Sequence, residues 1–275
     1  MNLKNARMTI SLIGLVGIAV IAYIWATSLI ASLYAYRSPF ADNPLPPSQQ
    51  IGKPISRQVV AILVDGLRVD TAANAKVMPF LNQLRASGAH ATMHSSTPSY
   101  SSPGWSTLLI GGWPEIHGGP AMNPPVGLSA IKWTQDNIFA AVRRAGLETS
   151  LAGSYFFTQM IPAAHLSQSR IVFDETHIGD TENATNAVAF IQSGKYHFNF
   201  VHLVQVDHAG HLEGGPRDPH WNQAASRADE HIRQIVSAMD LSQDTVLIFS
   251  DHGQIDQGGH GGHESIVLTE PFIMT

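Results

Sequence analysis

Three apolar runs along the chain each end close to an aspartate. They are residues 59–64 before Asp65, residues 200–206 before Asp207, and residues 246–249 before Ser250 and Asp251. Continuous apolar runs rich in β-branched residues indicate strands buried on both faces, the pattern of a parallel sheet. Ligands of open α/β sheets collect beyond the carboxyl ends of the strands, so three carboxylates are expected to converge on one edge.

Helical and strand patterns alternate over the rest of the chain from residue 57 onward. Helices are predicted at residues 78–87, 134–145, 181–192 and 222–239, and further strands at residues 89–93 and 148–152. Such alternation is typical of domains that bury a sheet between two layers of helices. The pattern predicts a doubly wound α/β domain over residues 57–275, with a mostly parallel central sheet and helices on both faces.

The N-terminal part has the pattern of a membrane anchor. Residues 8–36 contain no charged side chain, and about 20 apolar residues in a helix cross a bilayer. Lys4 and Arg7, in the short segment 1–7, favour a cytoplasmic N-terminus and an extracytoplasmic domain. A cleaved signal peptide is the alternative, but the apolar stretch is longer than a signal core. With the proline-rich residues 37–56 as an exposed linker, we expect a single-pass protein of the cell membrane.

Composition excludes several classes of function. The 275 residues carry a formal net charge of -5 and no cluster of Lys and Arg, so a nucleic-acid polymer is not an expected partner. The chain has no cysteine, which excludes disulfides and thiolate chemistry. Residues 270–275 resemble the start of a further strand, so the sequence is expected to be truncated at its C-terminus.

The acidic strand ends predict a metal centre, because carboxylates packed together repel one another unless cations lie between them. Asp207 and His211 are four residues apart, which places both on one face if the chain turns helically. With a later histidine they would form a nitrogen-rich site suited to zinc. Asp65, Asp251 and His252 would form a more oxygen-rich neighbour with room for a hydroxyl ligand. The alternative for each aspartate is a turn or a helix cap.

Two other histidines near these motifs are expected to take no part. His202 falls inside the predicted strand, and His208 points off the other side of the turn that follows it. The chain has 14 histidines, so most must lie on the surface or in packing.

The hydroxyl ligand is expected from the segment 97–112. This segment reads as a loop that enters a helix with Pro103 in its first turn, a favoured early position. A nucleophile at a helix N-terminus benefits from the positive end of the helix dipole and from free backbone N–H groups. Ser101 is well placed for that role. The alternative is that Ser101 or Ser102 is the N-cap of the helix.

Four blocks in order resemble the motifs of the alkaline phosphatase superfamily, and most of all those of its type I phosphodiesterase and nucleotide pyrophosphatase group. The blocks are Val64-Asp65-Gly66, Ser101 to Gly112 with Pro114 to Gly118, Asp207 to His211, and Ser250-Asp251-His252-Gly253. The resemblance extends over roughly residues 57 to 275 and implies the fold described above.

The resemblance also implies roles for the residues. Ser101 would be the nucleophile and would share one metal ion with the ligands Asp65, Asp251 and His252. A second ion would be held by Asp207, His211 and one downstream histidine. The group normally has Thr at the position of Ser101, and usually an Asn at the position of Gly104, so only the backbone of Gly104 is left to contact the phosphate.

The downstream histidine has two candidates. Asp251 to Gly261 resembles a block of the glycolipid ethanolamine-phosphate transferases, in which a histidine between glycines supplies the ligand. This resemblance implies His260, with His263 in reserve.

The resemblance implies that the protein is a membrane-anchored phosphoric ester hydrolase. It would use two divalent metal ions, expected to be zinc, and would form a phosphorylated Ser101 intermediate. Its substrate would be a small-molecule or lipid-headgroup phosphate ester. Alternatives are a phosphoethanolamine-type transferase, a catalytically silent binding module, or a sulfatase. The sulfatase motif has Arg where this chain has Trp105.

Overall fold

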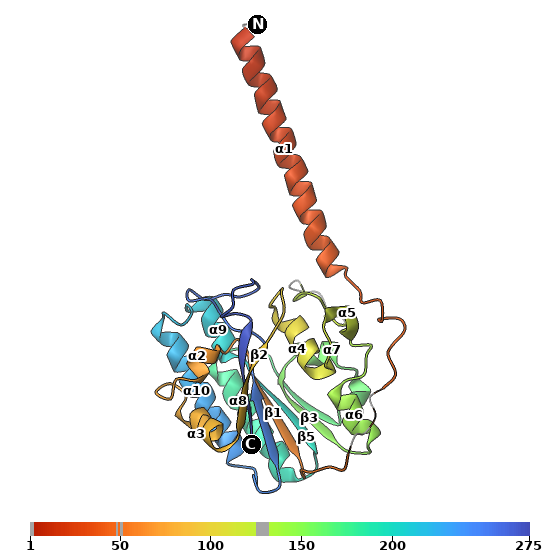
Figure 1. Ribbon diagram of the computed structural model, residues 1–275, viewed down its shortest axis with the longest axis vertical. Coiled ribbons are helices and arrows are strands. Elements are labelled where there is room, and N and C mark those ends of the chain that lie inside the picture. The colour runs from red at the N-terminus through yellow and green to blue at the C-terminus, as the bar shows by residue number, and fades with distance from the viewer. Residues whose placement is uncertain (1–2, 48, 50–51, 125–131) are drawn as a thin grey trace.

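The computed structural model describes residues 3–47, 49, 52–124 and 132–275 (Figure 1). A seven-stranded sheet of order β2-β7-β6-β1-β5-β3-β4 forms the centre of the domain. Its strands are β1 (Val59–Val64), β2 (Ala89–His94), β3 (Thr149–Ser154), β4 (Gln168–Val172), β5 (Phe198–Leu203), β6 (Thr245–Phe249) and β7 (Thr269–Met274). β7 pairs antiparallel with β6 and β2, and the other pairings are parallel. The mostly parallel sheet is therefore confirmed.

Helices cover both faces of the sheet, as a doubly wound fold requires (Figure 1). One layer contains α2 (Val69–Ala72), α3 (Pro79–Ser87), α8 (His177–Ser193), α9 (Gln205–Leu212) and α10 (Pro219–Val236). The other contains α4 (Ser101–Ile110), α5 (Pro114–His117), α6 (Ile138–Arg144) and α7 (Phe156–Met160), followed by a short 3₁₀ turn at Ala163–His165.

The central strand β1 shows why the sheet is buried on both sides. Val60, Ile62 and Val64 pack into the core beneath the first layer of helices. Ala61 and Leu63 point the other way, into the core beneath α4, α6 and α7. Apolar residues at consecutive positions thus fill both cores, because successive side chains of a strand point to opposite faces.

Several element boundaries differ from the sequence prediction for local reasons. The helix expected at residues 134–145 begins only at Ile138, because the Asn137 side chain accepts a hydrogen bond from Ala140 N and caps it. The helix expected at 181–192 begins earlier, after the cap Thr176. The strand expected at 200–206 ends at Leu203, and α9 begins two residues later at Gln205.

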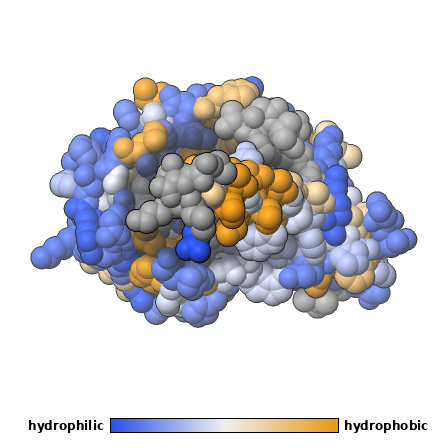
Figure 2. Space-filling model, turned by 90° about the horizontal axis from the view of Figure 1, so that it is seen from above, coloured by the Kyte–Doolittle hydropathy of each residue, from blue (hydrophilic) through white to orange (hydrophobic). Residues whose placement is uncertain are grey.

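The N-terminal helix α1 (Leu3–Tyr34) projects away from the domain (Figure 1). Its part Ala6–Tyr34 is long and apolar enough to cross a membrane and is not buried against the domain. Figure 2 looks down on this end and shows the apolar surface of α1 against largely hydrophilic surroundings. The carboxyl ends of the parallel strands lie on the same side of the domain as α1 (Figure 1).

The segment after α1 is not the fully exposed linker that the prolines predicted. Ser38 is buried, and its hydroxyl donates to Glu115 O at 2.6 Å. The Gln135 side chain accepts from Leu45 N at 3.0 Å and donates to Phe40 O at 2.6 Å. Residues 38–45 are therefore attached to the domain by side-chain hydrogen bonds, although all of them except Ser38 and Ala41 are exposed, as the prolines predicted.

Candidate metal centre and nucleophile

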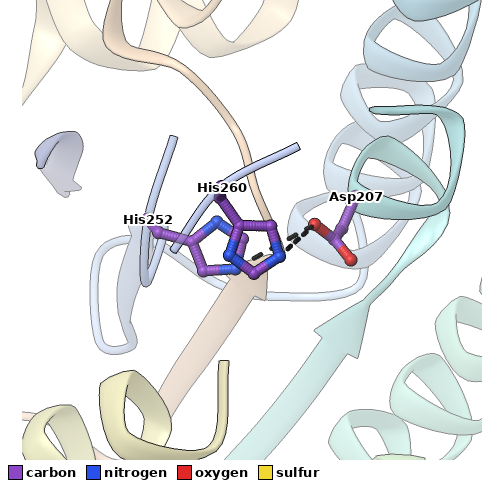
Figure 3. A group of neighbouring side chains, drawn as sticks. All are labelled: Asp207, His252 and His260. Atoms are coloured by element: carbon purple, nitrogen blue, oxygen red, sulfur yellow. Dashed lines mark ion pairs between the residues drawn. The ribbon is translucent and has the colours of Figure 1, made fainter. Parts of the chain in front are cut away.

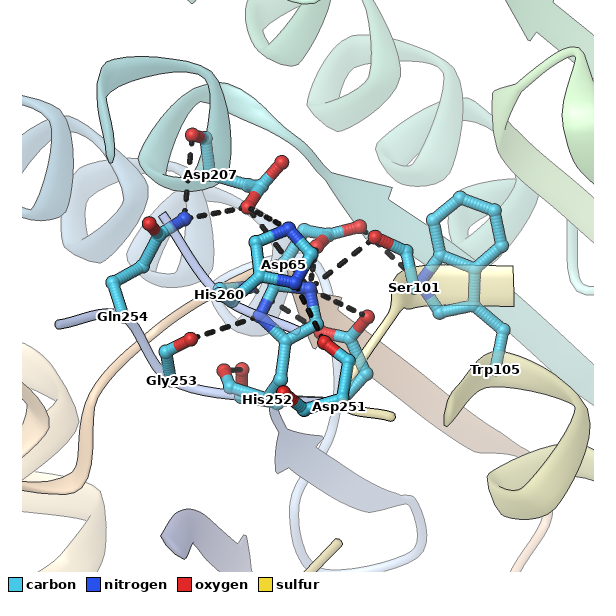
Figure 4. Close-up of polar contacts among 12 residues, drawn as sticks. Asp65, Ser101, Trp105, Asp207, Asp251, His252, Gly253, Gln254 and His260 are labelled. Atoms are coloured by element: carbon cyan, nitrogen blue, oxygen red, sulfur yellow. Dashed lines mark hydrogen bonds and ion pairs between the residues drawn. The ribbon is translucent and has the colours of Figure 1, made fainter. Parts of the chain in front are cut away.

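The three predicted aspartates converge at the carboxyl ends of neighbouring strands. Asp65 follows β1, Asp251 follows β6, and Asp207 lies in the first turn of α9 after β5. Since β6, β1 and β5 are adjacent in the sheet, these positions meet at one edge. Gly66 allows the close approach: its φ is +69°, and a Cβ there would lie 3.0 Å from the Cβ of Asp207. Figure 4 shows the three carboxylates facing a common centre.

The first group of candidate ligands contains Asp65, Asp251 and His252, all of which are buried. His252 Nε2 lies 3.3 Å from Asp65 Oδ1 and 3.5 Å from Asp251 Oδ2. This is the oxygen-rich grouping expected from the sequence, and the structure brings all of its members together.

The second group contains Asp207, His252 and His260 (Figure 3). His260 Nε2 is 3.6 Å from Asp207 Oδ1, and the rings of His252 and His260 stack with centroids 3.7 Å apart. The expected ligand His211 lies at the rim, 3.5 Å from Asp207 Oδ2 and 2.9 Å from His260 Nε2. Asp207 and His211 do share one face of α9, as their spacing predicted. The reserve candidate His263 is exposed and belongs to neither group.

Ser101 lies at the first position of α4, and its side chain faces the carboxylates (Figure 4). Its Oγ is 3.2 Å from His252 Nε2, the atom next to both aspartates of the first group. The N-cap of α4 is Tyr100, and no side chain caps the helix. The alternative role of Ser101 or Ser102 as N-cap is therefore wrong.

Gly104 does not offer its backbone N–H to a phosphate, contrary to the expectation from the sequence. This N–H donates to Tyr100 O at 3.1 Å, inside the first turn of α4. A Cβ at position 104 would lie 3.2 Å from Asp251 Cβ, so the glycine instead allows α4 to pack closely on the loop after β6. The side-chain amide near this helix end comes from Asn123, whose Oδ1 accepts from Ser102 N at 2.8 Å.

Three residues that sequence analysis missed hold the aspartates in place. His202 Nε2 lies 2.8 Å from Asp65 Oδ2, so the expectation that His202 takes no part is wrong. Trp105 Nε1 donates to the same oxygen at 3.2 Å, and Gln254 Nε2 donates to Asp207 Oδ1 at 2.6 Å. A polar histidine within an apolar strand was the available signal for His202. His208, in contrast, faces Glu175 and not the aspartates.

Burial and mutual repulsion dominate the electrostatics of the carboxylates. Burial, with the charge of Asp65 added, raises the pKa of Asp207 to about 7 and that of Asp251 well above its usual value. Burial also acts to raise the pKa of Asp65, but the hydrogen bond with His202 and the positive charge of the nearby His252 outweigh it and lower that pKa. Burial opposes the charge on His252, yet Asp251 and the other aspartates raise its pKa to about 10. A positive charge next to these carboxylates therefore stabilises the cluster.

The donor set fits divalent metal ions. Each of the two groups offers three ligand atoms within 4.8 Å of one another. Asp65 Oδ1 and Asp251 Oδ2 are buried without a hydrogen-bond partner in the described part of the chain, and a bound cation would satisfy both oxygens. Burial lowers the pKa of His260 to about 3, which keeps its imidazole neutral, as metal ligation requires.

The chain is similar in sequence to several known proteins. The chain is 22% identical over 236 residues to the human protein "GPI ethanolamine phosphate transferase 2, catalytic subunit", a match that covers 80% of this chain and 23% of that protein. It is 25% identical over 263 residues to the mouse "GPI ethanolamine phosphate transferase 1", covering 84% of this chain and 27% of the relative. The chain thus spans less than a third of the length of these curated relatives.

A solved structure of murine ectonucleotide pyrophosphatase / phosphodiesterase 5 superposes with a TM-score of 0.56 at 18% identity, covering 71% of this chain and 57% of that one. This likeness confirms the alkaline phosphatase-like fold. The sequence also matches the family model "Type I phosphodiesterase / nucleotide pyrophosphatase" over residues 59–268, a range that contains Asp65, Ser101 and all the other candidate ligands. The chain therefore belongs to the type I phosphodiesterase / nucleotide pyrophosphatase family.

Proposed function

We propose that the domain is a phosphoethanolamine-type transferase. Ser101 attacks a phosphodiester, and the phosphoethanolamine-type group is then passed to an acceptor alcohol. The observation that carries the proposal is the position of Ser101 Oγ, 3.2 Å from His252 Nε2 and at the N-terminus of α4. This hydroxyl already lies next to the candidate metal ligands. Family membership supports an enzyme that acts on phosphoester bonds.

The reaction has two balanced steps. Ser101 Oγ bonds to phosphorus while the bond from phosphorus to the leaving alcohol breaks; the serine proton is released and the leaving oxygen takes up a proton. An acceptor hydroxyl then attacks the phosphoserine on the opposite side, gives up its proton and frees Ser101, whose oxygen is protonated again. The N-terminus of α4 lies next to the phosphorus and stabilises its negative oxygens through the helix dipole.

The site would hold two divalent metal ions, and zinc is the expected metal. The ligands of the first ion would be Asp65, Asp251, His252 and Ser101. Those of the second ion would be Asp207, His260 and His211. When bound, such ions lower the pKa of a hydroxyl and neutralise charge on a leaving oxygen. His252 touches members of both groups, and it is therefore the residue by which the two halves of the site are coupled. Zinc is favoured because the second group is rich in imidazole nitrogen.

Transfer is preferred to hydrolysis because of the relatives. Those reported above are ethanolamine phosphate transferases by name, whereas the sequence alone favoured a hydrolase. The first step is common to both reactions, and they differ in whether an alcohol or water attacks phosphoserine. Hydrolysis remains the second candidate, supported by the family description and by the fold of the murine phosphodiesterase.

A sulfatase and a silent binding module are less well supported. Position 105 holds a tryptophan whose indole N–H is used on Asp65, so no guanidinium is available there for a sulfate. A silent module would not need Ser101 to face the ligand cluster. The apolar helix α1 supports attachment to a membrane, and we further propose that the domain lies on the extracytoplasmic side.

A partition experiment tests the proposal. The full chain in detergent with zinc is given the 4-nitrophenyl ester of phosphoethanolamine, with glycerol as acceptor, and products are identified by mass spectrometry. We expect glycerol phosphoethanolamine and an acid-stable phosphoryl adduct on Ser101. Free phosphoethanolamine as the sole product, at all glycerol concentrations, would support hydrolysis. Release of nitrophenol without any adduct on Ser101 would contradict the mechanism.

A further inference from the structure

A cavity of about 190 Å³ adjoins Ser101, and His260 is not among its lining residues. Its walls include Ser101, Asp65 and Asp207 of the candidate site, together with Phe156 and Glu175. No sequence motif predicted a role for Phe156 or Glu175. A group attached to a phosphorus atom at Ser101 would enter this cavity.

Glu175 supplies a carboxylate that the metal centre does not use. It belongs to neither group of candidate ligands found among the described residues. Its ion-pair contact in that part of the chain is with His208 Nδ1, at 4.0 Å, the outer limit for such a pair. The Glu175 side chain is 47% exposed, so a cation that enters the cavity can reach it from solvent without displacing a buried partner.

Phe156 supplies an aromatic wall of fixed orientation. Its ring centroid lies 4.1 Å from that of Tyr155 and 6.2 Å from that of Trp105, so two aromatic neighbours hold the ring in place. Tyr155 in turn stacks on Phe173, with centroids 5.3 Å apart. Aromatic faces attract cations, and a carboxylate next to such a face provides the two elements of an ammonium site.

The fold brings these residues together by strand order. Tyr155 and Phe156 follow β3, Phe173 and Glu175 follow β4, and the two strands are parallel neighbours. The turn that carries Glu175 is rigid, because Asp174 Oδ1 accepts from both Thr176 N and Thr176 Oγ1, and Thr176 caps α8. The backbone that carries Glu175 is therefore fixed, and Glu175 and Phe156 line the same cavity.

The size of the cavity also limits what it can take. A volume of about 190 Å³ is smaller than the roughly 300–1,000 Å³ of pockets that enclose drug-sized ligands. It suits a short aliphatic chain that ends in an amine better than a complete nucleoside.

We propose that Glu175 and Phe156 form the subsite for a primary ammonium group at the end of a two-carbon alcohol esterified to the phosphorus atom, which selects amino-alcohol phosphodiesters as substrates. This inference rests on the proposed function for the position of phosphorus at Ser101. It deepens that function, because the amine would stay bound in the subsite while the leaving alcohol departs and the acceptor enters.

Binding and turnover together test the subsite. The full chain with zinc is titrated with 2-aminoethylphosphonate and with propylphosphonate, which has a methyl group in place of the ammonium. The 4-nitrophenyl esters of phosphoethanolamine, propyl phosphate and thymidine phosphate are compared as substrates. The variants are Glu175→Gln, which removes the charge at nearly constant shape, and Glu182→Gln, an exposed carboxylate of α8, as the matched control.

We expect Glu175→Gln to weaken the binding of 2-aminoethylphosphonate by about tenfold or more, the range of a charge-assisted hydrogen bond, and to leave propylphosphonate unchanged. kcat/KM for the phosphoethanolamine ester should fall in parallel, and Glu182→Gln should alter neither ligand. Equal losses for both phosphonates, or a wild type that binds both equally, would overturn the subsite. A preference for the thymidine ester that Phe156→Ala abolishes would assign the cavity to a nucleotide base instead.

The two proposals fail in different ways. If no ester is cleaved but 2-aminoethylphosphonate still binds selectively through Glu175, the proposed function is wrong and the ammonium subsite stands. If the esters are cleaved through Ser101 without regard to the amine, the proposed function stands and the subsite is wrong.

Discussion

Ser101 Oγ and His252 Nε2 lie 3.2 Å apart, although 151 positions separate the two residues in the chain. α4 brings the serine from one layer of helices, and the loop after β6 brings the histidine from the centre of the sheet. The same nitrogen is within 3.5 Å of Asp65 and Asp251. This contact places the serine at the one nitrogen that both groups of candidate ligands share.

Replacement of Ser101 by alanine should remove turnover while the fold is retained. The variant deletes the proposed nucleophile and only one of several proposed ligands, so kcat should fall on the order of 10³-fold or more, as for other nucleophile deletions. Ser102→Ala is the matched control, because Ser102 contributes its backbone N–H, and not its hydroxyl, to the contact with Asn123. Initial rates and circular dichroism of both variants test this. A larger loss for Ser102→Ala would contradict the assignment.

The two histidines of the loop after β6 should differ in their importance. His260 is buried against Asp207 and His252, whereas His263 is exposed. His260→Ala should therefore lose one bound metal ion and most of the activity, because it removes one proposed protein ligand of the second site. His263→Ala should keep both ions. Elemental analysis of the purified chains decides, and retention of two ions by both variants would show that His260 is not a ligand.

Metal binding should compete with protons. Burial raises the pKa of Asp207 to about 7, so in the metal-free chain this carboxyl is largely protonated below that pH. A divalent ion must displace the proton, and its apparent affinity should fall as the pH drops below about 7. Zinc titrations in buffers of different ionisation enthalpy measure the protons released. One tightly bound calcium ion, with no release of protons, would favour a sulfatase-like centre instead.

The attachment of residues 38–45 to the domain should depend on Gln135. Its side chain bonds to backbone groups of both Phe40 and Leu45, so Gln135→Ala removes two connections at once. Limited proteolysis should then cleave between these two residues faster than in the wild type, since cleavage follows local opening. Gln223→Ala, an exposed glutamine of α10, is the control. Equal cleavage rates would show that Gln135 does not hold the segment.

The sheet and the convergence of the aspartates could be predicted because both depend on short-range patterns. An apolar run that ends in Asp65 or Asp251 specifies a buried strand and the chemistry at its end. The positions of neighbouring elements could not be predicted in this way. His202 and Asp65 meet across the pairing of β1 with β5, and Gln135 reaches Phe40 only after the α4–α6 layer has packed. Such contacts depend on tertiary packing and leave no periodic signal in the sequence.

Predictions at helix ends were wrong for a related reason. From the sequence, Ser101 could be a helix cap or a nucleophile, and the helix start after Tyr100 excludes the capping role. Its role as nucleophile stays a prediction. Gly104 was assigned to phosphate binding by alignment with a motif. Its N–H is used within α4 once the helix start is known. A shift of one or two residues in a helix boundary therefore changes which backbone groups are free.

Asp180 should control part of the pH dependence of stability. It is fully buried, and its carboxylate accepts from Val204 N at 2.7 Å and Gln205 N at 3.1 Å, where β5 passes into α9. Burial nevertheless raises its pKa from 3.8 to about 7. Between these two values the folded chain keeps a proton that the unfolded chain has released, so this group makes the free energy of unfolding fall as the pH rises.

Asp180→Asn removes this titration and keeps one side-chain acceptor for the two N–H groups. At about pH 4 the two chains should be close in stability, because a neutral carboxyl and a carboxamide each offer one carbonyl acceptor to the turn before α9. As the pH rises toward about 7, the wild type should lose stability relative to the variant. This change in relative stability is bounded by about 1.4 kcal/mol for each unit of pKa shift.

Urea unfolding of both metal-free chains at several pH values measures the change in relative stability, with Glu182→Gln as the control for loss of an exposed carboxylate on the same helix. A stability difference that stays constant from pH 4 to about pH 7 would show that Asp180 is already ionised in the folded chain, and that its hydrogen bonds to the start of α9 outweigh the effect of burial.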